Sequence, residues 1–287
     1  MTTSLNPSTN IAAFVQTVYE DAMLVVRENA LATSLYTVYT DRSGTAARTR
    51  SDYGTATIQS IGETDDMTSQ AFTPSAGNSL TPAEVGAQFF LTDLRVETDP
   101  FPVRADAAME LGMAIADKID TDCFSVFSSL TGGTVGTAGS VITWNYFYAM
   151  LARLVAQKAP KPYVFVCHPY QWHTLARAAS VASAVRTNAP EYLMDQVARN
   201  FYVANYSGVD IFVSSNVQTS STNAYAAMFS RPALAFDNRR APRLEPERDA
   251  SRRGWELNMT SVYAYGVWKA TYGIQGIFDA TAPAGTA

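Results

Sequence analysis

The chain has 287 residues, of which 47% are hydrophobic and only 16% are charged, and its net charge is −5. A chain of this length can bury a sizeable core. It contains no polybasic segment, so the sequence does not indicate general affinity for nucleic acid. It also contains no run of 18 apolar residues, so the sequence does not indicate a membrane-spanning helix. So few charges predict that other protein chains cover part of the surface. Two cysteines make no disulfide framework, and the N-terminal residues MTTSLNPSTN lack the features of a secretory signal.

Residues 10–33 carry apolar side chains at helical spacing after Asn10, a suitable N-cap, and predict a helix. Residues 40–100 are rich in Thr, Ser, Gly, Asp and Gln and are too long for an ordinary loop. We expect a two-stranded arm there, with one strand near 53–61, a polar tip at 65–79 and a return strand near 84–96. Because an isolated two-stranded ribbon is marginal in water, we expect this arm to lie on another subunit.

Residues 103–130 give the clearest helical pattern in the chain. An apolar residue recurs every three or four positions, at Ala108, Leu111, Ile115, Ile119, Cys123, Val126 and Leu130. Pro102 suits the start and Gly132 with Gly133 the end. About 26 helical residues would make a rod of about 40 Å, which is long for a compact domain.

The second half predicts alternating helices and strands. Thr143 would cap a helix over 144–158 that Pro160 and Pro162 end. A strand at 163–167, a break at His168-Pro169 and a helix from Pro169 to about Ala178 follow. We then expect a short helix at 191–199, strands at 209–214 and 224–229, and further strands over 255–277. Between them, more than half of residues 237–253 are charged.

The stretch YVFVCHPYQWHTL (residues 163–175) holds both histidines of the chain and one of its cysteines. His168 and His173 are five residues apart across a strand-to-helix break, and consecutive Cys167 and His168 point to opposite sides of a strand. Three ligands therefore do not converge on one ion, and Cys167 follows residues of buried type, unlike a reactive thiol. We predict no metal, cofactor or catalytic residue here. Trp172 and Leu175 would face the core, and His173 solvent or a neighbour.

Two clusters of charged residues could also form binding sites. Asp117, Asp120 and Asp122 are spaced three and two apart near the end of the long helix, which does not bring them to one point, so a solvated face or a subunit contact is expected. The mixed signs in 237–253 favour paired charges on strands or at an interface over a phosphate site. The sequence contains no phosphate loop, zinc-protease motif, Cys-x-x-Cys or Gly-x-Ser-x-Gly.

The order of these elements resembles that of tailed-bacteriophage major capsid proteins of the Hong Kong 97 type. Three segments carry the resemblance: Val164 to Pro169 with Trp172 and Leu175, Gly208 to Val217 with the strands after it, and Glu245 to Trp268 with its Tyr-Gly-Val ending at 265–267. It implies a mixed α/β, Hong Kong 97-like capsid fold. The divisions would be an N-terminal arm (1–40), an extended loop (41–100), a peripheral domain with the long helix (101–162), an axial domain (163–237) and return strands with the C-terminus (238–287).

The resemblance also implies a function. Pentamers and hexamers of the chain would form an icosahedral shell around the double-stranded DNA of a tailed phage, with no catalysis, no sequence-specific DNA binding and no membrane. The chain would be made in the bacterial cytoplasm and end in the virion capsid. Its partners would be itself, a portal protein, a separate scaffolding protein or none, and optionally decoration proteins. Two alternatives stay open: an encapsulin shell enclosing enzymes and, ranked lower, an enzyme with a site at Cys167 and His168.

Charged residues of the extended loop and of the return strands are our candidates for subunit contacts. They are Arg48, Arg50, Asp65, Asp66, Asp93, Arg95, Arg239, Arg240, Arg243, Glu245, Glu247 and Arg248. Some members of the resembled family weld their shells through a loop lysine. Residues 41–100 contain no lysine, so we expect no such crosslink.

Overall fold

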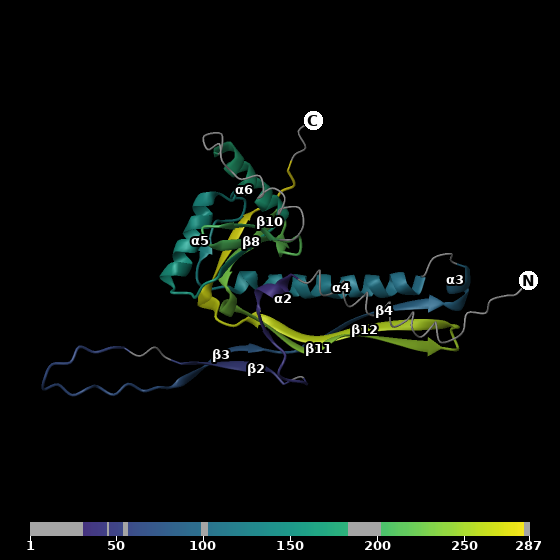
Figure 1. The fold of residues 1–287 in the computed structure, drawn as a ribbon, viewed down its shortest axis with the longest axis horizontal. Helices are drawn as coiled ribbons and strands as arrows, with labels where there is room; N and C mark the ends of the chain where they lie inside the picture. Colours follow the sequence, from purple (N-terminus) through teal and green to yellow (C-terminus); the bar gives the residue numbers. More distant parts are fainter. Residues whose placement is uncertain (1–30, 45, 54–56, 99–102, 183–201, 284–287) are drawn as a thin grey trace, which may run out of the picture.

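The computed structural model describes residues 31–44, 46–53, 57–98, 103–182 and 202–283. The helix predicted at 191–199 and nearly all of the one predicted at 10–33 lie outside these residues. The described chain forms a long four-stranded sheet under one long helix, a seven-stranded sheet at one end of it, and a two-stranded arm that leaves the body (Figure 1). The mixed α/β fold class is confirmed.

The four-stranded sheet is built on two long antiparallel strands, β11 (Leu234–Asp249) and β12 (Gly254–Val267), with β1 (Thr37–Tyr39) and β4 (Ala83–Thr92) at its edges. Helix α4 (Val103–Ser125) lies along one face and continues into a 3-10 turn, η1 (Val126–Ser129). The predicted stripe is the buried one: Leu111, Ile115 and Ile119 share a core with side chains of β11 and β12 such as Phe236, Leu257 and Met259.

The seven-stranded sheet has the order β5-β13-β10-β6-β8-β7, with β9 beside β10. One buried core joins it to helix α5 (Trp144–Ala156), whose Phe147, Met150 and Leu154 meet Phe165 and Ile274 of the sheet. The strand bounds are β5 (Thr134–Val135), β6 (Tyr163–Cys167), β7 (Tyr202–Tyr206), β8 (Val209–Val213), β9 (Thr219–Ser220), β10 (Asn223–Ser230) and β13 (Gly273–Asp279). The predicted helix at 144–158 and the strands at 163–167, 209–214 and 224–229 are confirmed.

Short helices connect these parts. Helix α6 (Pro169–Ala182) follows β6 at the predicted His168-Pro169 break. The others are α2 (Ala32–Leu35), α3 (Asp93–Thr98), η3 (Arg231–Ala233) and η4 (Ala270–Tyr272).

The arm differs from the prediction. Its strands are β2 (Arg48–Tyr53) and β3 (Pro74–Leu80), which pair with each other from Arg48↔Leu80 to Tyr53↔Pro74. The expected return strand near 84–96 is instead β4, which pairs with β12 from Ala83↔Tyr263 to Thr92↔Gly254 before α3 begins. That part of the prediction was wrong because alternation reveals a strand without naming its partner, and β12 offers β4 a longer ladder than the arm does.

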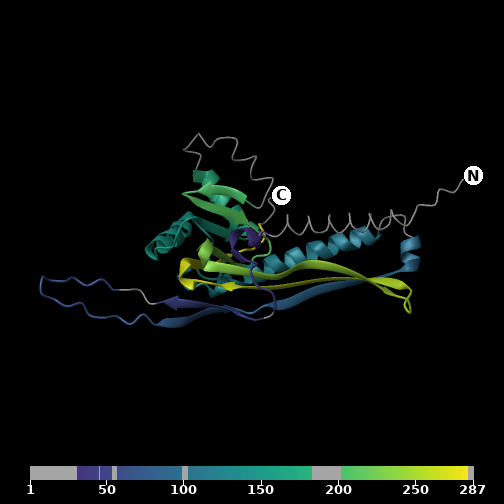
Figure 2. The same cartoon turned by 60° about the horizontal axis from the view of Figure 1, so that its bottom comes forward.

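Figures 1 and 2 show strands β2 and β3 alongside the body, with the segment 57–73 between them projecting beyond it at one end of the long axis. The turn between β11 and β12 lies at the opposite end in both views. The described part of the molecule is therefore elongated, with the segment 57–73 at one end and a strand turn at the other.

Candidate subunit-interaction site

The arm meets the body through a cluster of four charged residues, the root cluster: Asp41, Arg48, Asp237 and Arg239. The Asp237 carboxylate is fully buried, and its Oδ2 accepts hydrogen bonds from Nε of Arg48 and Nε of Arg239, both at 2.9 Å. Arg48 also donates to Asp41, which lowers the pKa of that exposed carboxyl group. Two buried guanidinium groups thus face one buried and one exposed carboxylate, which balances the charge.

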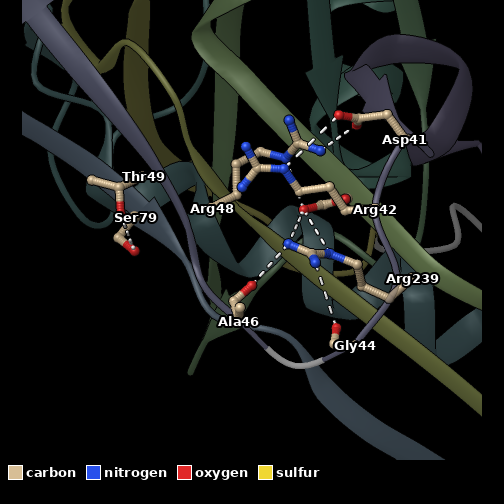
Figure 3. A network of polar contacts seen from close by, with 9 residues as sticks. Asp41, Arg42, Gly44, Ala46, Arg48, Thr49, Ser79 and Arg239 are labelled. Atoms are coloured by element: carbon tan, nitrogen blue, oxygen red, sulfur yellow. Dashed lines mark hydrogen bonds and ion pairs between the residues drawn. The ribbon is translucent and has the colours of Figure 1, made fainter.

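Arg239 binds the chain that leads into the arm. Its Nη2 donates to the carbonyl of Ala46 at 3.0 Å, and its Nη1 to that of Gly44 at 3.5 Å (Figure 3). Gly44 has a φ of +84°, a left-handed conformation that suits glycine and lets the chain turn here. Arg48 lies over the ring of Tyr39, 4.3 Å from its centroid. Charge-assisted bonds therefore hold the chain at Asp41, Gly44, Ala46 and Arg48.

Two weaker contacts lie further along the arm. Nη1 of Arg50 donates to the carbonyl of Trp268 at 3.3 Å, and Arg50 pairs with Asp52 on the arm itself. Leu80, at the end of β3, is buried in a small cluster with Ala235 and Ala264 of the four-stranded sheet. These contacts attach the base of the arm and leave its outer part free.

The outer part of the arm, residues 57–73, exposes large apolar side chains, of which Phe72 stacks on Tyr53 of β2 with 4.7 Å between the ring centroids. Ile58 is 95% exposed, Phe72 74% and Met67 71%. Its tip is a turn in which Asp65 Oδ2 accepts the Gly62 N–H at 3.0 Å. The charged residues of this segment are all acidic, because no lysine or arginine occurs between residues 51 and 94. Exposed apolar groups of this size mark interaction surfaces.

Most of the remaining candidates lie along the four-stranded sheet and on α3, and Asp93 and Arg248 are at the end opposite the arm. Asp93, at the start of α3, accepts two bonds from Arg248, at 2.6 and 2.7 Å, and this arginine lowers the pKa of Asp93. Arg248 also lies beside the ring of Trp255, 5.6 Å from its centroid. Two further arginines form ion pairs at the surface, Arg240 with Glu84 and Arg243 with Glu245. Arg95 and Glu247 are exposed.

The sequence and the fold of this chain are similar to those of known proteins. The sequence model of a family described as "Phage capsid protein" matches residues 77–274, which is more than half of the chain. The chain belongs to this family. The capsid protein is thus a structural component of the virion shell. No curated protein sequence matches it.

Solved structures share the fold of the capsid protein at low sequence identity. The capsid of Ralstonia phage GP4 matches with a TM-score of 0.67 and 11% identity, over 91% of this chain and 89% of that chain. The capsid of cyanophage P-SCSP1u matches with a TM-score of 0.65 and 14% identity, over 85% and 86%. A virus-like particle from Pyrococcus furiosus matches with a TM-score of 0.61 and 8% identity, over 91% and 97%. The Hong Kong 97-like fold expected from the sequence is confirmed.

The predicted interface residues of the capsid protein fall into three groups. Arg48 and Arg239 have buried partners inside the chain, and Arg50 is partly covered by Trp268. Asp65 and Asp66 lie at the exposed arm tip. Asp93, Arg95, Arg240, Arg243, Glu245, Glu247 and Arg248 lie on the four-stranded sheet and on α3, where contact with another subunit remains a prediction. Sequence reasoning missed Asp41 and Asp237; the apolar run Leu234-Ala235-Phe236 just before Asp237 was a signal that this aspartate is buried.

The residues around His168 of the capsid protein form scaffold. Burial raises the pKa of the Cys167 thiol and lowers that of His168. Gln171 is fully buried, and its Nε2 donates to the carbonyls of Ala224 in β10 and Phe278 in β13, at 2.9 and 3.2 Å. Leu175 is buried and His173 exposed, as predicted. Gln171, whose side chain joins α6 to two strands of the sheet, was not predicted from the sequence.

Of the three aspartates considered on α4, Asp117 is exposed, in line with the expected solvated face, whereas Asp120 is buried, which corrects the expectation for that residue. Asp117 accepts a bond from Nδ2 of Asn216 at 2.7 Å, and Asp122 accepts the hydroxyl of Tyr263 at 2.8 Å. Asp120 is only 2% exposed and accepts the N–H groups of Leu31 and Ala32 at the start of α2. In the described ranges, no group of three histidine, cysteine or acidic residues is arranged to hold a metal ion. No helix among those residues is long and apolar enough to cross a membrane.

Proposed function

We propose that the capsid protein is the major shell protein of a tailed phage and assembles as pentamers and hexamers into an icosahedral shell around double-stranded DNA. The observation that carries this is the outer part of the arm, which exposes Ile58, Met67 and Phe72 beyond the body. In water such a ribbon has no support of its own, so a neighbouring copy is the natural cover. Closed symmetry then multiplies many weak contacts.

We propose to divide the protomer by its two large sheets. The peripheral domain is the four-stranded sheet with α4, and the axial domain is the seven-stranded sheet with α5, since α5 and β13 share the core of the latter. The extended loop then ends before β4. The capsid protein has no catalytic role in this proposal. A portal protein, a separate scaffolding protein and decoration proteins are its proposed partners, and the bacterial cytoplasm is the place of assembly.

The test is the size and content of the particles. The purified chain at micromolar concentration is expected to sediment as megadalton shells that electron microscopy shows to be icosahedral, and a stable monomer would contradict the proposal. Particles recovered from the phage are expected to contain double-stranded DNA. Enclosed enzymes without DNA would favour the encapsulin alternative. Substitution of both histidines by asparagine should leave assembly unchanged, whereas loss of a measured turnover would support an enzyme.

A further inference from the structure

The backbone pairing of the sheet stops where the arm begins. The chain leaves the four-stranded sheet at Tyr39, which is paired with Asp237 of β11, and rejoins it at Ala83, which is paired with Tyr263 of β12. Between these points β2 and β3 pair with each other, and no described strand of the body extends their ladder. The direction of the arm is therefore set by side-chain contacts at its base.

Asp237 occupies the decisive position among these contacts. It is the last residue of β11 to face β1, and a register shift follows at once, so that Arg239 has no partner in β12. Bulges of this kind re-aim a side chain, and Arg239 points to the residues entering the arm (Figure 3). One buried oxygen of Asp237 then joins a guanidinium group of the body to one of the arm.

We propose that Asp237 is the positioning residue of the arm: by sharing Oδ2 between Arg239 and Arg48, it fixes the angle at which residues 48–80 leave the body, and so the spacing of neighbouring copies. The second part rests on the proposed function. A buried ion pair suits this role because its energy depends steeply on geometry in a low-dielectric site. The apolar contact of Leu80 is non-directional and would tolerate sliding.

The arm angle can be measured as a distance between two spin labels. Ser60 lies on the exposed outer arm and Ala152 on the exposed face of α5, and cysteines introduced at both positions would carry the labels. Native Cys123 and Cys167 are fully buried, so they stay unlabelled in the folded chain. Pulsed electron resonance on the full chain, kept below the concentration at which shells form, is expected to give one narrow distance distribution.

The primary variant is Arg48→Gln. It removes the ion pair between Arg48 of the arm and Asp237, and it leaves the Asp237–Arg239 pair in the body. We expect its distance distribution to be at least twice as wide, and the thermal midpoint of the body to fall because a buried pair loses one partner, with the body still folded at the temperature of measurement. Arg243→Gln is the matched control, because Arg243 lies on β11, as Asp237 does, and pairs with the exposed Glu245. It should keep the narrow distribution.

Asp237→Asn is the second variant and should widen the distribution as well. If it fails to fold, the double variant Asp237→Asn/Arg239→Gln removes both charges of the pair and gives the same readout. In shells, Arg48→Gln should broaden the spread of particle diameters. An unchanged distribution in Arg48→Gln, or equal widening in Arg243→Gln, would overturn the assignment. Failure of the wild type to form shells would refute the proposed function, while the distances would still decide the role of Asp237.

Discussion

The Asp120 carboxylate is the one acidic group of α4 that is almost completely buried. Its two oxygens accept the N–H groups of Leu31 and Ala32, at 3.0 and 2.9 Å. Burial raises its pKa from 3.8 to about 6, although the two backbone bonds act in the opposite direction. The residue therefore holds the start of α2 on α4 while carrying a charge that the site disfavours.

This arrangement predicts a specific pH dependence of stability. Between about pH 4 and 6 the folded chain keeps a proton on Asp120 that the unfolded chain has released, so the group stabilises the fold most below about pH 4 and loses this contribution as pH rises through about 6. Between pH 4 and 7.5, the free energy of unfolding of the wild type should fall by about 2 kcal/mol relative to that of Asp120→Asn. Urea titration of the unassembled chain measures this, and identical pH profiles would contradict it.

At the scale of elements, the exposed side chains of the outer arm are expected to contribute to contacts between subunits and not to the stability of a single chain. Ile58 and Met67 are 95% and 71% exposed, so they contribute little to the fold of one chain. Both would lose water contact only against a neighbour. Burial of apolar surface contributes roughly 25 cal/mol per Å², so each of these side chains could supply about 1 to 3 kcal/mol to a subunit contact.

The variant Ile58→Ser/Met67→Ser should therefore leave the thermal midpoint of the unassembled chain within about 1 °C of the wild type. Its critical concentration for assembly should rise at least tenfold, as measured by sedimentation. The control is Val155→Ser on α5, which is 56% exposed and lies outside the arm. Wild-type assembly by the double variant would show that the outer arm is not a contact surface.

Local patterns in the sequence predicted most helices and strands but not all of their partners. The stripe through Leu111, Ile115 and Ile119 predicted α4 because each turn of a helix repeats the same geometry. The return of the arm was wrong because strand pairing joins residues such as Ala83 and Tyr263, whose match no local pattern encodes. For the same reason Arg48 and Arg239 were chosen for their charge, whereas their shared partner Asp237 was found only in three dimensions.

At the scale of the whole molecule, the two large sheets both pack against the turn η1. Phe127 is fully buried, and its ring centroid lies 5.3 Å from that of Phe124 in α4 and 5.7 Å from that of Phe229 in β10. The turn also contacts β12 and β13. The Phe127 side chain thus packs between α4, which lies on the four-stranded sheet, and β10 of the seven-stranded sheet.

We therefore expect Phe127→Ala to destabilise both sheets together, by about 3–5 kcal/mol. Hydrogen exchange followed by mass spectrometry should show the same fractional loss of protection in β11–β12 as in β6–β10. Phe72→Ala on the exposed outer arm is the matched control and should change neither sheet. Loss of protection confined to the seven-stranded sheet would mean that the sheets unfold separately.

The assembled shell should come apart into single chains under denaturing conditions. The segment 41–100 contains no lysine, so it offers no amine for an isopeptide bond with a neighbour. A denaturing gel of purified particles is expected to show one band near 31.1 kDa. A ladder of covalent multimers would contradict this.

The attachment of the arm at its base also has a mechanical consequence. A fully extended chain rises about 3.3 Å per residue, so 15 residues, the number from Arg48 to Gly62, can span at most roughly 45 Å. A lever of this length turns a tilt of about 5° at its pivot into a displacement of about 4 Å at its tip, by simple geometry on that estimated length. Shifts of well below 1 Å in the atoms around Asp237 would therefore displace the tip of the arm by the width of a side chain. The position of one buried carboxylate would thus control a contact made far from it.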